Sequence, residues 1–179
     1  MQYREATLAD AEAIAALHAE SWRYAYRGSY SDEYLDGPVF EDRFRVWRER
    51  MTSPRAGQYV VLAEDEGALV GFACAFAKED ERWGTLLDNL HVKPSLHRHG
   101  LGRQLVGEIA RWTNERYPGE GLYLWVLDKN ERARRFYAAL GGADVETRES
   151  AAPDGGRVTA HRIAWTKETA RELAAMAKA

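Results

Sequence analysis

The chain has 179 residues, a formal net charge of -3 and a single cysteine. This length fits one domain with a sizeable core, and the negative charge argues against a nucleic-acid partner bound through its phosphates. The lone Cys74 excludes an intramolecular disulfide, which suits a reducing compartment.

The sequence carries no sign of secretion or of a membrane span. Its opening, MQYREATLAD, has no apolar signal-type stretch, and no run of about 18 apolar residues occurs anywhere. We therefore expect a soluble, cytoplasmic protein with no membrane partner. Cys74 lies within the apolar run GFACAFA without a CxxC or catalytic pattern, so we expect a buried structural thiol.

The first half of the chain alternates between strand and helix patterns. Residues 2–6 predict a short strand, and residues 8–22 predict a helix with Asp10 as its N-cap. An irregular, aromatic-rich stretch follows and becomes helical at FEDRFRVWRERM. Two β-branched runs around EDEG, residues 58–77, predict a hairpin, and WGTLLDNLHV, residues 83–92, predicts a third strand.

The second half predicts a strand–helix pattern followed by a hairpin. A helix over residues 101–112 stops near YPGEG, and LYLWVL, residues 122–127, reads as a buried strand. A further helix over residues 130–142 closes on a glycine pair. Residues 143–165 predict a hairpin across PDGG, and an alanine-rich helical tail follows.

The order of these elements predicts one mixed α/β domain, because antiparallel strands come first and a strand–helix–strand–helix unit comes in the middle. No internal repeat, low-complexity tract or long linker divides the chain. We expect a single domain over residues 1–165 and a C-terminal helical extension over residues 166–179.

The helix after Gly102 lacks the Ser, Thr, Asp or Asn that usually caps a helix start. Gly100, Gly102 and a cluster of His and Arg stand there instead, which suits an anion supplied from outside the chain. The segment is not a dinucleotide fingerprint, because Leu105 holds the third glycine position. It is not a P-loop, because Glu108 replaces the phosphate-binding lysine.

Two motifs in the right order resemble the GCN5-related N-acetyltransferase (GNAT) superfamily. LHVKPSLHRHGLG is similar to a strand followed by the family's Q/R-x-x-G-x-G/A loop, although His97 takes the Q/R position. NERARRFYAALGG reproduces the second motif, an Asn followed by Ala, Phe-Tyr and Leu-Gly. The resemblance extends over nearly the whole chain and implies an acetyl-CoA-dependent N-acetyltransferase.

The resemblance also implies a fold and a cofactor site. The sheet would be mostly antiparallel and flanked by helices, with a splayed parallel strand pair that holds pantetheine, while the loop amides bind the pyrophosphate. Asn130 would contact the cofactor, and it equally suits a helix N-cap. The implied cofactor-binding residues are Leu90, Val92, His97, Arg98, His99, Gly100, Leu101, Gly102, Arg103 and Asn130.

We expect no metal at this loop, because His97 and His99 have no evident third ligand and serve better as a basic rim for phosphates. The basic side chains of KNERARR have two interpretations. They form a solvated helix face, or one or two of them reach the adenosine 3′-phosphate.

Two side chains are candidates for the acyl-transfer chemistry. The resemblance favours Tyr137 as the general acid that protonates the departing thiolate, whereas spacing alone favours a core aromatic. Many relatives place a Glu at the position of Leu86, which cannot accept a proton. Asp88 lies two residues on, on the same face of a regular strand. It is a candidate base or anchor for a cationic amine, and a carboxylate without a catalytic role is the alternative.

The segment SWRYAYRGSYSDEYLDG interleaves aromatic and acidic side chains. The resemblance puts this segment on the acceptor side, where Trp22 and Tyr26 would bind an ammonium group through cation–π attraction. Packing of the loop on the core is the alternative. We therefore expect a small-molecule or peptide amine as acceptor and leave a homodimer open. A catalytically silent acyl-CoA-binding or interaction module on the same fold is the second functional hypothesis.

Overall fold

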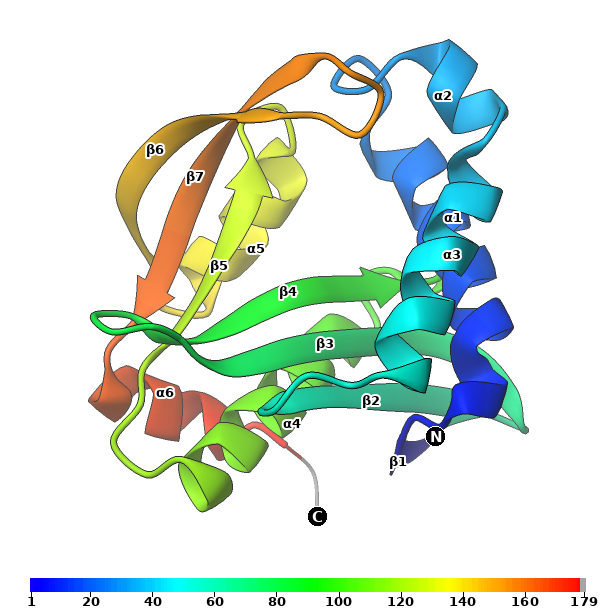
Figure 1. Ribbon diagram of the computed structural model, residues 1–179. Helices are drawn as coiled ribbons and strands as arrows, with labels where there is room; N and C mark the ends of the chain where they lie inside the picture. The colour runs from blue at the N-terminus through cyan, green and yellow to red at the C-terminus, as the bar shows by residue number, and fades with distance from the viewer. Residues whose placement is uncertain (178–179) are drawn as a thin grey trace.

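The computed structural model describes residues 1–177, and Figure 1 shows its helices and strands. In chain order the elements are β1 (Gln2–Glu5), η1 (Leu8–Asp10), α1 (Ala11–Ala25), α2 (Asp32–Asp36), α3 (Val39–Thr52), β2 (Gln58–Asp65), β3 (Ala68–Asp80), β4 (Gly84–Val92), η2 (Pro94–Leu96), α4 (Leu101–Arg116), β5 (Leu122–Leu127), α5 (Glu131–Ala139), β6 (Ala143–Ala151), β7 (Arg157–Trp165) and α6 (Lys167–Ala174).

The seven strands form one sheet in the order β1-β2-β3-β4-β5-β7-β6. Neighbouring strands are antiparallel except for β4 and β5, which are parallel. The predicted mixed α/β fold, with a mostly antiparallel sheet and one parallel pair, is confirmed.

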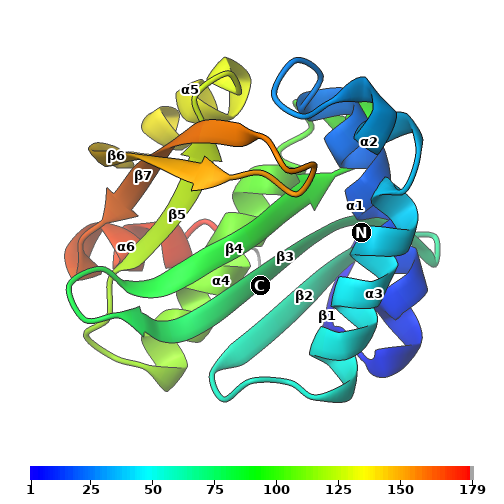
Figure 2. The same ribbon diagram turned by 45° about the horizontal axis from the view of Figure 1, so that its top comes forward.

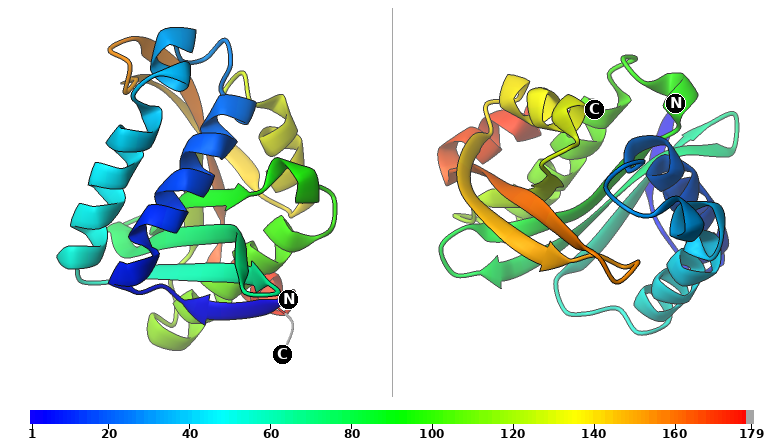
Figure 3. Two further views of the ribbon diagram at one scale, coloured as in Figure 1. Left: turned by 90° about the vertical axis from the view of Figure 1, so that its right-hand side faces the viewer. Right: turned by 90° about the horizontal axis from the view of Figure 1, so that it is seen from above.

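Helices cover both faces of the sheet. The α1–α3 layer lies on one face of β2–β4, and α4 lies on the other face (Figures 1 and 3). Successive residues of β2 therefore enter different cores: Leu62 packs with Trp47 of α3, and Val61 packs with Leu105 of α4. Because both faces are buried, this strand reads as a continuous apolar run rather than an alternating one.

Strand β4 carries a bulge where it parts from β5. Cys74 of β3 pairs with Asn89 and Ala75 pairs with Leu87, so Asp88 is an extra residue on β4. The β4–β5 ladder includes only the pairs of Thr85 and Leu86 with β5. Beyond Leu86 the two strands diverge (Figure 1). The bulge thus coincides with the start of the gap.

Asp10 is the N-cap residue of α1, as predicted, but its side chain makes no capping hydrogen bond to that helix. Its carboxylate instead accepts hydrogen bonds from the backbone N–H of Thr7 at 2.7 Å and from the guanidinium of Arg4 at 2.7 and 2.8 Å. Glu64 shares the same guanidinium. The carboxylate is therefore bound by Thr7 and by Arg4 of β1 rather than by the free amides of α1.

Three further features concern Cys74, the C-terminal helix and the lengths of the helices. Cys74 is fully buried, and burial raises the pKa of its thiol to about 12, as befits a structural cysteine. Helix α6 packs Ala170 and Leu173 into the core beneath α4. The last part of the predicted extension, residues 178–179, lies outside the described residues. No helix in the described part of the chain is long and apolar enough to cross a membrane.

Candidate active site

The loop before α4 presents an uncapped helix start. Arg98 and Gly100 adopt left-handed backbone angles, with φ of 70° and 80°, and no side chain caps the helix at Gly100. A Cβ on Gly100 would meet nothing within 4 Å, whereas a Cβ on Gly102 would lie 3.3 Å from the ring of Phe136. Leu101 is buried in the core and anchors the helix. The open amides of this first turn therefore sit beside free space at Gly100 and beside α5 at Gly102.

His97 ties this loop to its neighbours. Its Nε2 lies 3.1 Å from the Val92 carbonyl, and its Nδ1 lies 2.7 Å from the guanidinium of Arg132. Arg132 donates to Nδ1, so the ring keeps its proton on Nε2 and donates it to Val92. Burial and the charge of Arg132 lower the pKa of His97, which favours this neutral form. The ring centroid of Tyr24 lies 5.4 Å from that of His97, so His97, Arg132 and Tyr24 form one cluster.

The rest of the basic rim is exposed. His99 turns its Nδ1 toward the His97 carbonyl at 3.0 Å, and Arg98 and Arg103 face solvent. Within residues 1–177, no three His, Cys, Asp or Glu side chains meet in a metal-binding arrangement. The loop thus offers backbone amides and guanidinium groups, which are ligands for an anion.

The gap between β4 and β5 starts just below this loop. Leu90 and Val92 pair with β3 on one edge of β4, and the β5 ladder does not extend to them. Asn130 begins α5 on the opposite side of the gap. Its side chain accepts a hydrogen bond from the Ala133 N–H at 3.2 Å, so the N-cap interpretation is confirmed.

Tyr137 of α5 and Asp88 of β4 both act electrostatically on Tyr26, which follows α1. Tyr137 is 8% exposed, and its ring packs against Phe136 and Trp165 with centroids 5.1 and 6.1 Å apart. Burial raises the pKa of its phenol, so the group stays protonated. Burial also raises the pKa of Tyr26, and the nearby Tyr30, Tyr137 and Asp88 raise it further. These three elements therefore share one electrostatic environment.

Asp88 is held by an arginine that the sequence did not reveal as a site residue. The Nη1 of Arg50, on α3, lies 2.7 Å from Asp88 Oδ2 and donates to Asn89 Oδ1 at 2.8 Å. Leu86 packs with the core of the α1–α3 layer, so Asp88 and Leu86 lie on the same side of β4.

The aromatic cluster near α2 is mostly packing. Trp22 is 7% exposed, and its ring centroid lies 5.5 Å from that of Tyr26 and 5.2 Å from that of Tyr30. The guanidinium of Arg43 already covers Trp22 at 4.3 Å from its centroid. Trp22 is thus a packing residue of this cluster, whereas Tyr26 is partly exposed and is influenced electrostatically by Asp88 and Tyr137.

Sequence analysis also missed a buried polar cluster between α1, α3 and β4. The indole N–H of Trp47 donates to His18 Nδ1 at 2.9 Å, and Ser21 Oγ lies 2.8 Å from His91 Nδ1. The two imidazoles are 4.3 Å apart. Burial lowers the pKa of both, that of His91 to about 3, so both rings are neutral. The sequence could have pointed to His18 and His91 only weakly, because each is a polar residue at a helix or strand position whose apolar neighbours indicate burial.

Two hydrogen bonds connect the segment after α1 with turns in the second half of the chain. The Ser31 N–H donates to Asp154 at 2.6 Å, and Lys129 Nζ donates to the Gly28 carbonyl at 2.5 Å. They join the α1–α2 segment to the β6–β7 turn and to the β5–α5 turn (Figures 1 and 2). Residues from both halves of the chain therefore meet on this side of the gap.

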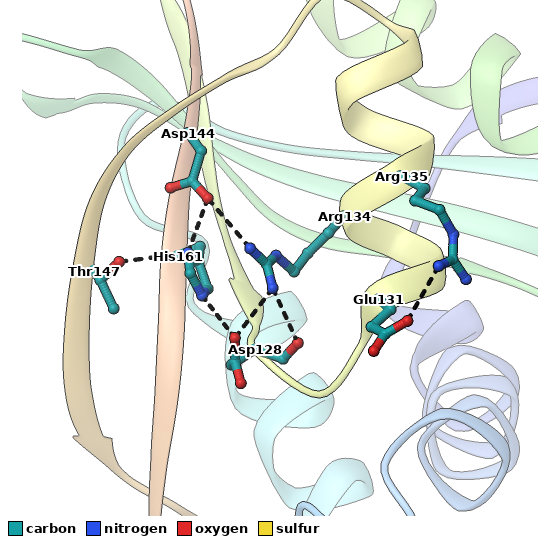
Figure 4. A network of polar contacts seen from close by, with 7 residues as sticks. All are labelled: Asp128, Glu131, Arg134, Arg135, Asp144, Thr147 and His161. Atoms are coloured by element: carbon teal, nitrogen blue, oxygen red, sulfur yellow. Dashed lines mark hydrogen bonds and ion pairs between the residues drawn. The ribbon is translucent and has the colours of Figure 1, made fainter.

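A charged network fixes the β5–α5 turn (Figure 4). His161 on β7 lies 2.9 Å from both Asp128 and Asp144, one on each ring nitrogen. Arg134 of α5 also reaches both carboxylates, at 3.1 and 3.5 Å. This network holds the helix that carries Asn130 and Tyr137 against β6 and β7.

The model of the acetyltransferase (GNAT) family matches residues 14–141. The chain belongs to this family. It is an acetyltransferase, and the resemblance found in the sequence is confirmed. It is 28% identical over 130 residues to the uncharacterised N-acetyltransferase YuaI of Bacillus subtilis, covering 71% of this chain and 72% of that relative. It is also 28% identical over 143 residues to a probable N-acetyltransferase, Rv2775, of Mycobacterium tuberculosis, covering 76% of each.

Solved structures share the fold. A PaiA N-acetyltransferase from Thermoplasma acidophilum, in complex with coenzyme A, has a TM-score of 0.72 at 18% identity and covers 92% of this chain and 98% of its own. YncA from Salmonella typhimurium, a putative acetyltransferase with its cofactor acetyl-CoA, has a TM-score of 0.65 at 19% identity, covering 93% and 94%. At these identities the likeness shows the fold alone.

Proposed function

We propose that this protein transfers an acetyl group from acetyl-CoA to a primary amine by direct attack in a ternary complex. The observation that carries the proposal is the gap between β4 and β5. It opens at the bulge of Asp88 and lies beside the uncapped start of α4.

The residues around the gap fit acetyl-CoA. The space at Gly100 would admit a phosphate to the helix amides, and the free edge of β4 at Leu90 and Val92 would pair with the pantetheine amides. Asn130 would contact the cofactor through the part of its amide that does not cap α5. The coenzyme complexes of the two solved neighbours support this assignment.

The remaining cofactor contacts follow from the loop. We propose that the amides of Arg98 to Arg103 hold the pyrophosphate and that His97, through Arg132, keeps the loop closed on β4. His99 and the exposed arginines would add positive charge at the rim.

The chemistry requires a protonated acid and a neutral amine. Bound acetyl-CoA supplies a thioester carbonyl and a thiolate leaving group. Tyr137 would donate its phenolic proton to the thiolate, since burial keeps that proton in place. Asp88 would attract the ammonium form of the acceptor and accept its proton, directly or through a water.

The acceptor would enter from the side of Tyr26, with Trp22 behind it. We propose a small amine or a peptide N-terminus, in keeping with a space framed by the Ser31–Asp154 contact. We further propose that residues 1–165 form the catalytic unit, with residues 166–179 as its helical extension, and that the protein works in the cytoplasm.

A panel of amines tests this function. Purified protein is mixed with acetyl-CoA and with amino acids, polyamines, aminoglycosides or short peptides, and released thiol is followed by absorbance. We expect thiol release to require one class of amine. Tight acetyl-CoA binding without amine-dependent release would support the alternative, a catalytically silent acyl-CoA-binding module.

A further inference from the structure

Adjacent side chains on β4 reach the same arginine, which a regular strand does not permit. Successive residues of a strand point to opposite faces, yet Asp88 and Asn89 both contact Arg50 Nη1, at 2.7 and 2.8 Å. The bulge explains this, because Asp88 is the extra residue and restarts the alternation. Arg50 therefore binds a conformation of β4 that exists only with the bulge.

Arg50 is itself held in place by the α1–α3 layer. Its guanidinium lies 5.2 Å from the ring of Trp47 and 5.3 Å from the ring of Phe76. Its backbone carbonyl accepts a hydrogen bond from Gln58 at 3.1 Å. Trp47 is fully buried, so the arginine is carried by a rigid part of the core rather than by a mobile loop.

The ion pair leaves half of the Asp88 carboxylate available. Arg50 occupies Oδ2, and within residues 1–177 no partner is found for Oδ1. The side chain is 29% exposed, and it acts electrostatically on Tyr26 at the acceptor side. A carboxylate fixed through one oxygen offers the other in a defined direction.

We propose that Arg50 is a positioning residue for the acceptor step: it fixes the Asp88 carboxylate so that Oδ1 faces the acceptor amine. This inference rests on the proposed acetyl transfer. In this role Arg50 acts through Asp88, so its loss should affect the amine and not acetyl-CoA.

The first test is a double-mutant cycle of Arg50→Gln and Asp88→Asn, with steady-state kinetics in the amine. Arg50→Gln should lower kcat/KM for the amine by about 10- to 100-fold, the cost of a misplaced reacting group. In the Asp88→Asn background, the same change should have almost no further effect. Two full, additive losses would overturn the proposal, because Arg50 would then act independently of Asp88.

Conservative and control variants complete the test. Arg50→Lys keeps the positive charge and can still donate hydrogen bonds to Asp88 and Asn89, so it should recover most of the activity. This variant keeps the proposal testable if Arg50→Gln fails to fold. Arg48→Gln, on the exposed face of the same helix, should behave like wild type. Acetyl-CoA affinity, measured by calorimetry, should stay within about twofold in every variant. Equal loss of acetyl-CoA affinity and amine kcat/KM would also overturn the proposal.

The result also separates this inference from the proposed function. Wild-type protein that transfers acetyl to no amine refutes the function. Active wild type with an equally active, folded Arg50→Gln variant refutes only the role of Arg50.

Discussion

Replacing Tyr137 by Phe removes one hydroxyl and leaves the ring in place. The ring would keep its contacts with Phe136 and Trp165. Among the described residues, no partner accepts a hydrogen bond from the Tyr137 hydroxyl, so the fold loses none. We therefore expect the free energy of unfolding to change by less than about 1 kcal/mol.

The rate should respond far more strongly. Loss of a general acid typically costs about 10²- to 10⁴-fold, which corresponds to about 2.7–5.4 kcal/mol of transition-state stabilisation at about 1.36 kcal/mol per tenfold. Burial raises the pKa of Tyr137, so wild type keeps this proton through neutral and mildly alkaline pH. The deficit of Tyr137→Phe should therefore be the same from about pH 6 to pH 9.

The assay follows thiol release at saturating acetyl-CoA and amine, with acetyl-CoA affinity measured by calorimetry in parallel. We expect a large fall in kcat with nearly unchanged affinity. Wild-type turnover in a folded Tyr137→Phe variant would refute the reasoning and leave Tyr137 as a core aromatic.

Three further changes probe other parts of the account. Gly100→Ala should cost about 1–2 kcal/mol of stability through its left-handed backbone and weaken acetyl-CoA binding at least about tenfold. The control Gly67→Ala has φ of 79° and the same open space, so it should lose stability alone, and equal acetyl-CoA affinities would contradict the loop assignment. Burial lowers the pKa of His91 to about 3, so the folded state binds fewer protons than the unfolded chain. Stability should fall as the pH drops from about 6.5 toward 3, by at most about 1.4 kcal/mol per pH unit for this histidine. His91→Gln should flatten the dependence of Tm on pH between 7 and 5, and equal slopes would argue against a buried neutral ring. Tyr26→Leu should raise the amine KM by about 2- to 30-fold through lost cation–π attraction without changing the acetyl-CoA KM; a matching rise in both would assign Tyr26 to packing.

Much of the fold follows from local patterns in the sequence. Apolar periodicity predicts the long helices and the early strands, because burial of one face dictates which positions must be apolar. The absent side-chain cap at Asp10 shows the limit of local rules, since the guanidinium of Arg4, which Glu64 also binds, pairs with that carboxylate instead.

The parts of the site that the sequence did not predict depend on distant pairs. The hydrogen-bonded pairs are far apart in the sequence: 39 residues separate Arg50 and Asn89, 70 residues separate Ser21 and His91, and 123 residues separate Ser31 and Asp154. Nothing local marks Asp88 as the bulged residue, because a bulge is a property of two strands rather than of one. The sequence can single out the loop, Asn130 and Tyr137 as candidates because their motifs are contiguous in the chain.

The most direct test of acetyl transfer uses acetyl-CoA with an isotopically labelled acetyl group and the best amine from the panel. Mass spectrometry then follows the label in the amine and in the intact protein. The account predicts that the label appears on the amine only when the protein is present, and that protein incubated with acetyl-CoA alone carries none. Label bound covalently to the protein, or retained on coenzyme A while the amine stays unmodified, would contradict direct transfer between the two substrates.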